Sequence, residues 1–301
     1  MTAPLPAVDV ISATRPGPIV GILGGVHGDE YEGVLAASLL RRELGAELLR
    51  GEVRIAAPAH PAAWSARTRS SPHDGTNLAR VFPGRPDGCP TEQIAYLLTQ
   101  RLIDGVDLLI DLHSAGANFE MPLLCGYNDG DDRRGTVSRR CADAFAAHFT
   151  WIHPAVPAPG RSVSAAYALD VPAIYVESRG GLTVRADDLQ AYLDGVRRVL
   201  HDLGMLGEAP PALHRPVRVR GDGDTDSGIV APVGGYVVVH CGVGARLRRG
   251  ELIATILQPD GAPAAEIASP QSGYAMLLRR DAHVAKGDTV CIVAPSARSR
   301  G

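Results

Sequence analysis

Short apolar runs alternate with stretches of helical spacing through the first two thirds of the chain, and this alternation limits the folds open to it. It predicts an α/β fold with a mixed, mostly parallel sheet and helices on both faces. In the last helical stretch, Asp187 and Asp188 stand near the start, where a helix N-terminus favours negative charge. The predicted strands are 18–24, 52–57, 107–112, 121–127 and 171–177, and the predicted helices are 31–49, 91–104, 135–148 and 186–204.

The last third of the chain has a different character. A proline-rich segment at 207–216 precedes short β-like runs separated by glycine turns. Two longer segments of this region, each made of several such runs, share a sequence pattern. They resemble the quasi-symmetric halves of a biotinyl/lipoyl-type flattened β-barrel. We therefore expect an α/β domain at 1–206, a linker at 207–216 and a small all-β, barrel-like domain at 217–301. The segment between the halves contains no lysine, so we expect an unmodified domain and not a carrier.

Composition excludes several classes of protein. Apolar residues make up 45% of the chain and charged residues 21%, and the net charge is -3 without any block of like charge. These values are typical of a soluble globular protein and predict neither a nucleic-acid nor a membrane partner. The five cysteines form no CxxC pair, and the N-terminus does not resemble a signal peptide. We therefore expect free thiols and a cytoplasmic location.

Metal-binding residue types follow three of the predicted strands. His27 and Glu30 lie in GGVHGDEYEG, His113 lies in LLIDLHSAG, and Glu177 lies in AIYVESRGG. In open α/β sheets, chemistry gathers at the carboxyl ends of the strands. Two imidazoles and one carboxylate are a common ligand set for catalytic zinc, and the fourth coordination position stays open for water. The remaining glutamate could then act as the general base. Asp111 precedes His113 by two residues and either orients a metal ligand or caps the strand.

The order of these motifs resembles a known family. GVHGDE, DLHSAG, YVESRGG and the stretch NLARVFPG at 77–84 are similar to motifs of the succinylglutamate desuccinylase/aspartoacylase family, relatives of the zinc carboxypeptidases. The resemblance implies a zinc carboxypeptidase-like fold with a β-rich appended domain. It also implies one Zn²⁺ per chain bound by His27, Glu30 and His113, with Glu177 as the general base.

The resemblance further implies that Arg80 binds a substrate carboxylate, for which a planar guanidinium is well suited. The chain departs from the family beside this arginine, because Ala79 replaces the usual asparagine. Recognition of the substrate is therefore expected to be rebuilt or weakened. The other candidate substrate contacts are Asn77, Arg67, Arg69 and Arg179.

Together these features predict a zinc-dependent amidohydrolase that removes the acyl group from a small N-acyl amino acid or related N-acyl amine. Two alternatives stay open: a zinc carboxypeptidase for short peptides, and a catalytically degenerate binding relative. An appended β-domain restricts access to the site in the family, which favours a small-molecule substrate. The sequence leaves open the acyl group, the amine, the metal bound in the cell and whether the chain forms a homo-oligomer.

Overall fold

The computed structural model describes residues 4–223 and 227–297, and a mixed eight-stranded sheet is its largest element. The strand order is β1-β3-β2-β4-β8-β6-β7-β9. Only the β1–β3 and β6–β8 pairs are antiparallel, so the predicted fold class is confirmed. The strands are β1 (Asp9–Ser12), β2 (Ile19–Gly24), β3 (Glu52–Ala56), β4 (Leu108–Leu112), β6 (Leu124–Asn128), β7 (Phe149–His153), β8 (Ala173–Glu177) and β9 (Val217–Arg220).

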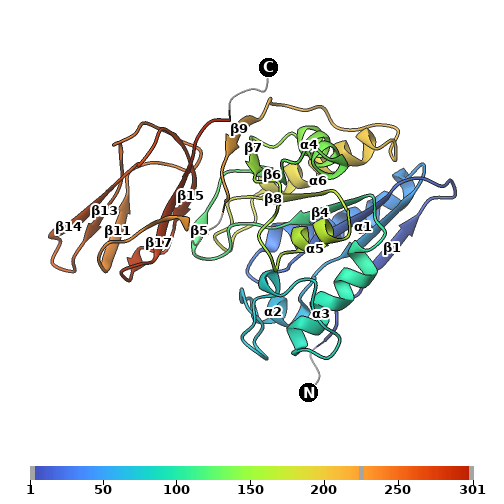
Figure 1. Ribbon diagram of the computed structural model, residues 1–301, viewed down its shortest axis with the longest axis horizontal. Helices are drawn as coiled ribbons and strands as arrows, with labels where there is room; N and C mark the ends of the chain where they lie inside the picture. Colours follow the sequence, from blue (N-terminus) through green and yellow to red (C-terminus); the bar gives the residue numbers. More distant parts are fainter. Residues whose placement is uncertain (1–3, 224–226, 298–301) are drawn as a thin grey trace.

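Helices cover both faces of this sheet, as predicted. One apolar core joins the sheet to α1, α4 and α6, and a second joins the opposite face to α3 and α5. Figure 1 shows α4 and α6 on one side of the sheet and α3 on the other. The helices are α1 (Tyr31–Glu47), α2 (Pro61–Ala66), α3 (Pro90–Leu98), α4 (Arg133–Phe145), α5 (Ser162–Ala168) and α6 (Ala186–Asp202), with a 3-10 turn η1 (Leu78–Arg80) and a π-helical segment η2 (Thr99–Ile103).

The centre of the sheet sets the level at which the site is built. Every residue of β4 is buried, as expected for a strand that is covered on both faces. In the parallel register, Leu112 of β4 lies beside Gly24 of β2 and Val176 of β8. The chain segments that follow these three residues therefore leave the sheet at one edge, at the same height.

The C-terminal strands form a separate all-β unit, drawn in orange and red in Figure 1. Its two antiparallel sheets have the orders β10-β17-β15-β12 and β14-β13-β11-β16. The unit is joined to the α/β part because β5 (Phe119–Glu120) pairs with β15. Its strands are β10 (Ile229–Val230), β11 (Gly235–Val239), β12 (Arg246–Leu247), β13 (Leu252–Leu257), β14 (Pro263–Ala268), β15 (Gly273–Arg279), β16 (His283–Val284) and β17 (Thr289–Ala294).

Three strands of the large sheet escaped prediction, and the first is β1 (Asp9–Ser12), which pairs with β3. β7 was not expected, and β9 was assigned to the β-rich tail, although it pairs in parallel with β7. The first strand after the expected domain boundary at residue 217 therefore pairs with the large sheet, and the boundary itself stays a prediction. Only Val219 of β9 is buried. The alternating VRVR pattern is therefore that of a largely exposed strand, and it does not distinguish an edge strand of the large sheet from a strand of the tail. The strands and helices that were predicted begin or end within a few residues of their observed bounds, except that 91–104 is divided between α3 and η2.

Within residues 4–223 and 227–297, no helix combines the length and apolarity that a membrane crossing needs.

The close contact between α1 and β4 leads to a stability prediction. A Cβ atom at Gly33 of α1 would lie 2.3 Å from the carbonyl oxygen of Leu112, whereas one at Gly45 of the same helix would meet nothing within 4 Å. We expect Gly33→Ala to lower the free energy of unfolding by roughly 1–3 kcal/mol through overpacking. Gly45→Ala is the matched control and should raise it by roughly 0.5–1 kcal/mol through helix propensity. Urea unfolding of both variants tests this, and equal effects would contradict the packing argument.

Candidate metal centre and active site

Three neighbouring strands deliver the candidate metal ligands and the candidate general base to one edge of the sheet. His27 and Glu30 lie in the loop between β2 and α1, where Glu30 is the N-cap residue of the helix. His113 directly follows β4, and Glu177 is the last residue of β8. Because β2, β4 and β8 are adjacent and parallel, residues that are far apart in the sequence meet there.

The Glu30 carboxylate lies between the two histidines. Its Oε1 is 2.7 Å from Nδ1 of His27, and its Oε2 is 2.8 Å from Nδ1 of His113. One ligand atom from each of the three residues lies within 4.8 Å of the others. Burial opposes ionisation of Glu30, yet the two histidines hold its pKa well below the usual range. A buried, ionised carboxylate between two imidazoles is a donor set that fits a divalent metal such as zinc.

Neighbouring groups orient the imidazole of His113. Oδ2 of Asp111 lies 3.0 Å from Nε2 of His113 and also accepts a hydrogen bond from the hydroxyl of Ser162. The hydroxyl of Tyr192 donates to the carbonyl of His113. Burial lowers the pKa of His113, but Asp111 and Glu30 raise it well above the ordinary value. Nδ1 of His113 is thereby directed toward Glu30, and Nε2 toward Asp111.

Asn77, a candidate substrate contact, lies outside the cavity lining and contacts His27. Its Oδ1 accepts from the backbone N–H of Ala79 at 2.9 Å and lies 3.1 Å from Nε2 of His27. An amide oxygen only accepts, so Nε2 of His27 carries a hydrogen toward Asn77. In the neutral ring that a metal ligand requires, Nδ1 is then the nitrogen with the free lone pair, on the side of Glu30. Asn77 therefore sets the tautomer that a metal ligand requires.

Glu177 faces a cavity of about 330 Å³ that it shares with His27, His113 and Asp111. Its Oε2 is buried and has no hydrogen-bond partner among the described residues. Burial, and then the nearby Glu30 carboxylate, raise the pKa of Glu177 to about 8. The carboxyl group therefore holds a proton readily, as a group that accepts and releases protons near neutral pH must.

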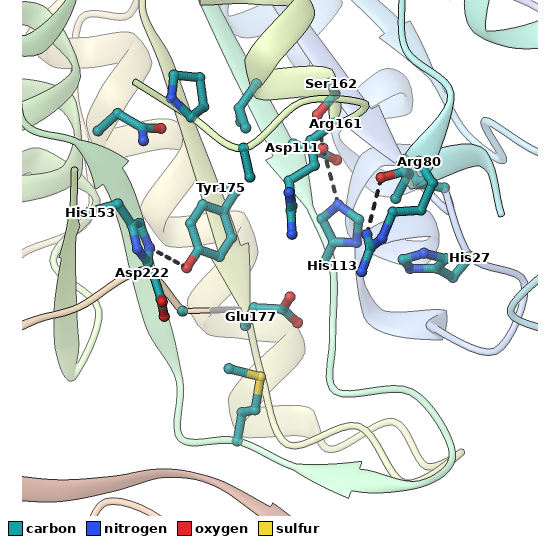
Figure 2. A pocket seen from close by; sticks show the side chains of 18 of the residues that line it. His27, Arg80, Asp111, His113, His153, Arg161, Ser162, Tyr175, Glu177 and Asp222 are labelled. Carbon is teal, nitrogen blue, oxygen red and sulfur yellow. Dashed lines mark hydrogen bonds and ion pairs between the residues drawn. The ribbon is translucent and has the colours of Figure 1, made fainter. Parts of the chain in front are cut away.

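The candidate arginines divide into two groups. Arg69 and Arg80 line the cavity; Nη1 of Arg69 lies 2.9 Å from Oε1 of Glu30, and Nη1 of Arg80 donates to the carbonyl of Ala79. Arg67 and Arg179 lie outside the cavity lining, because Arg67 ends α2 on the surface and Arg179 is directed toward Asp187 at 3.7 Å. Figure 2 shows Arg80 beside His27.

The cavity also contains polar residues that the sequence did not single out: Asn128, His153, Arg161, Tyr175 and Asp222. One signal was available, since Tyr175 precedes Glu177 by two residues on a strand and so points to the same face. Asn128 ends β6, and His153 ends β7, a strand that was not predicted. Arg161 precedes the unpredicted helix α5, and Asp222 follows β9, which was assigned to the tail.

The family model for the succinylglutamate desuccinylase/aspartoacylase catalytic domain matches residues 16–203. The chain belongs to this family. The N-alpha-acetyl-L-2,4-diaminobutyric acid deacetylase of Halomonas elongata is 28% identical over 288 residues, which cover 95% of this chain and 84% of the relative.

Solved structures of the family share the whole architecture. A succinylglutamate desuccinylase from Silicibacter sp. superposes with a TM-score of 0.88 at 26% identity, covering 96% of this chain and 88% of that one. The product-bound ectoine utilization protein EutE (DoeB) from Ruegeria pomeroyi superposes with a TM-score of 0.87 at 26% identity, with the same coverage of 96% and 88%.

The raised pKa of Glu177 gives a pH-dependent prediction for metal-free protein. Between the ordinary value of 4.5 and about 8, the native state keeps the proton that the unfolded chain loses. The contribution of this group to stability therefore falls as the pH rises through that window. Relative to the wild type, Glu177→Gln should be about 4 kcal/mol more stable at pH 8.5 than at pH 5. Urea unfolding with a chelator measures this difference, and an unchanged difference at the two pH values would contradict it.

Proposed function

We propose that the protein is a zinc-dependent amidohydrolase that removes the acyl group from a small N-acyl amino acid or related amine. The observation that carries this proposal is the opening of one cavity onto the His27–Glu30–His113 set, the protonatable Glu177 and two arginines. Membership of the family and the deacylase names of its relatives support the proposal.

His27, Glu30 and His113 would hold one zinc ion per chain. The fit rests on donor chemistry, since all three are preferred zinc ligands, and on the buried carboxylate, which a cation would stabilise. When bound, zinc supplies Lewis acidity toward the amide carbonyl and lowers the pKa of water. Asn77 and Asp111 hold the two imidazoles in the orientation that this role requires.

Glu177 would act as the general base and then as the general acid. Its carboxylate accepts a proton from the attacking water and later delivers that proton to the leaving amine. Arg69 stands beside Glu30 and is placed to stabilise negative charge on the amide oxygen as the tetrahedral intermediate forms. Arg80 lines the same cavity and would bind the α-carboxylate of the substrate.

The C-terminal β unit would limit the size of the substrate. Leu277 of β15 lines the cavity, whereas the candidate metal ligands all come from the α/β part. The apolar contacts of Leu277 and Met276 with Phe149 and Trp151 hold the unit against the large sheet. This arrangement favours a small N-acyl amino acid over a peptide that must extend beyond the cavity.

The first prediction from this proposal concerns metal content. Purified protein should contain about one zinc per chain, and His27→Ala or His113→Ala should remove most of it, because two donors hold zinc poorly. His73→Ala is the control, since His73 is exposed and lies outside the ligand group. Elemental analysis measures the metal, and retention of zinc in both histidine variants would contradict the ligand assignment.

The second prediction concerns catalysis. Glu177→Gln keeps the shape of the side chain and removes its basicity, so zinc should stay bound while kcat falls by roughly 100-fold or more. Assays with N-acetyl amino acids, together with elemental analysis of the same samples, separate the two effects. Turnover near that of the wild type would mean that another group moves the proton.

A further inference from the structure

The end of the cavity away from His27 is formed by a hydrogen-bonded pair. Nε2 of His153, at the end of β7, lies 2.7 Å from the hydroxyl oxygen of Tyr175 on β8. Nδ1 of His153 lies 2.8 Å from the carbonyl oxygen of Gly221. Figure 2 shows His153 and Asp222 on one side of the cavity, Arg80 and His27 on the other, and Tyr175 and Glu177 between them.

The direction of these hydrogen bonds follows from the carbonyl of Gly221. A carbonyl only accepts, so Nδ1 of His153 carries the hydrogen, and Nε2 of the neutral ring is an acceptor. Burial lowers the pKa of His153 to about 4, which keeps the ring neutral near pH 7. The hydroxyl hydrogen of Tyr175 is therefore committed to His153, and its oxygen can only accept a hydrogen bond from a ligand.

The position of the Tyr175 ring is built into the sheet. Gly126 of β6 lies opposite Tyr175 in the β6–β8 register. A Cβ atom at residue 126 would lie 2.0 Å from Cε1 and 2.6 Å from the hydroxyl oxygen of Tyr175. The missing side chain lets the tyrosine cross β6 and reach His153 on β7, so the acceptor is held by the fold.

Asp222 brings negative charge to this end. It follows β9, lines the cavity and accepts hydrogen bonds from the hydroxyl of Ser227 at 3.0 and 3.1 Å. Arg161 also lines the cavity, and its charge reaches His153. Asp222 directly follows Gly221, whose carbonyl contacts Nδ1 of His153, so its carboxylate belongs to the same end of the cavity as the His153–Tyr175 pair. A group that binds beside Asp222 therefore meets acceptors and a carboxylate.

We propose that Asp222 and the hydroxyl oxygen of Tyr175 form a subsite for a positively charged ammonium group, so that N-acylated diamino acids are the preferred substrates. An ammonium has three donors and no acceptor, and it matches this end of the cavity. A side-chain carboxylate would meet the like charge of Asp222. This proposal rests on the proposed deacylase function, with Arg80 binding the α-carboxylate at the other end. The relative from Halomonas elongata is named for a substrate of this class.

Three substrates of similar size test the proposal: N-alpha-acetyl-2,4-diaminobutyrate, N-acetylnorvaline and N-acetylaspartate. In the wild type, kcat/KM for the diaminobutyrate derivative should exceed that for the norvaline derivative by about 10-fold or more, and the aspartate derivative should be the poorest. Asp222→Asn should lower kcat/KM about 10- to 100-fold for the cationic substrate and change it less than about 3-fold for the norvaline derivative. Tyr175→Phe should act in the same direction with a smaller loss.

The control is Asp87→Asn, which makes the same change of charge at an exposed residue outside the cavity lining and should leave all three rates unchanged. Equal losses for the cationic and neutral substrates in Asp222→Asn, or a wild type that prefers the norvaline derivative, would overturn the subsite. Because the wild-type preference needs no variant, the test does not depend on the folding of Asp222→Asn.

Binding separates failure of the subsite from failure of the proposed function. Calorimetry on the wild-type holoenzyme should show 2,4-diaminobutyrate binding about 10-fold or more tightly than norvaline, and Asp222→Asn should remove most of this difference. If no acyl substrate is hydrolysed but this binding difference is found, the deacylase function fails and the subsite stands. Equal binding of the two amino acids overturns the subsite, whether or not the chain hydrolyses amides.

Discussion

The contact of one buried carboxylate with two imidazoles connects the parts of this site. Glu30 occupies the N-cap position of α1, and its carboxylate contacts His27 in the same loop and His113 after β4. The N-terminus of α1 favours the negative charge of Glu30, and the histidines hold its pKa low although the side chain is buried. The position of the loop after β2 relative to β4 therefore depends on charge balance at this point as well as on packing.

Close packing brings the elements near enough for that contact. A Cβ at Gly28 would lie 1.9 Å from the carbonyl oxygen of Ala63, so the loop that carries His27 lies directly against α2. Gly33 allows α1 to approach the carbonyl of Leu112, the residue before His113, in the same way. Both glycines remove side-chain volume where the backbone of one element approaches another.

The metal ligands and several groups proposed for recognition come from different elements of the fold. The candidate metal ligands and Glu177 come from β8 and the loops after β2 and β4. His153, Asp222 and Leu277 come from β7, the segment after β9 and β15, respectively. Substitutions in the second group can alter the substrate without disturbing the buried contacts of Glu30. This division agrees with relatives that share the architecture and carry names for different N-acyl substrates.

The sequence by itself determined the fold class, the family and the group formed by His27, Glu30, His113 and Glu177. It could do so because each of these residues ends or follows an apolar run, and the ends of adjacent parallel strands lie at one edge of a sheet. The tertiary structure alone decided that Asn77 contacts His27 and that Arg67 and Arg179 lie away from the cavity. It also decided the pairing of β9 with β7 and the meeting of Tyr175 with His153 across Gly126. These contacts depend on strand order and register, which arise from the packing of the whole sheet and leave no local pattern in the chain.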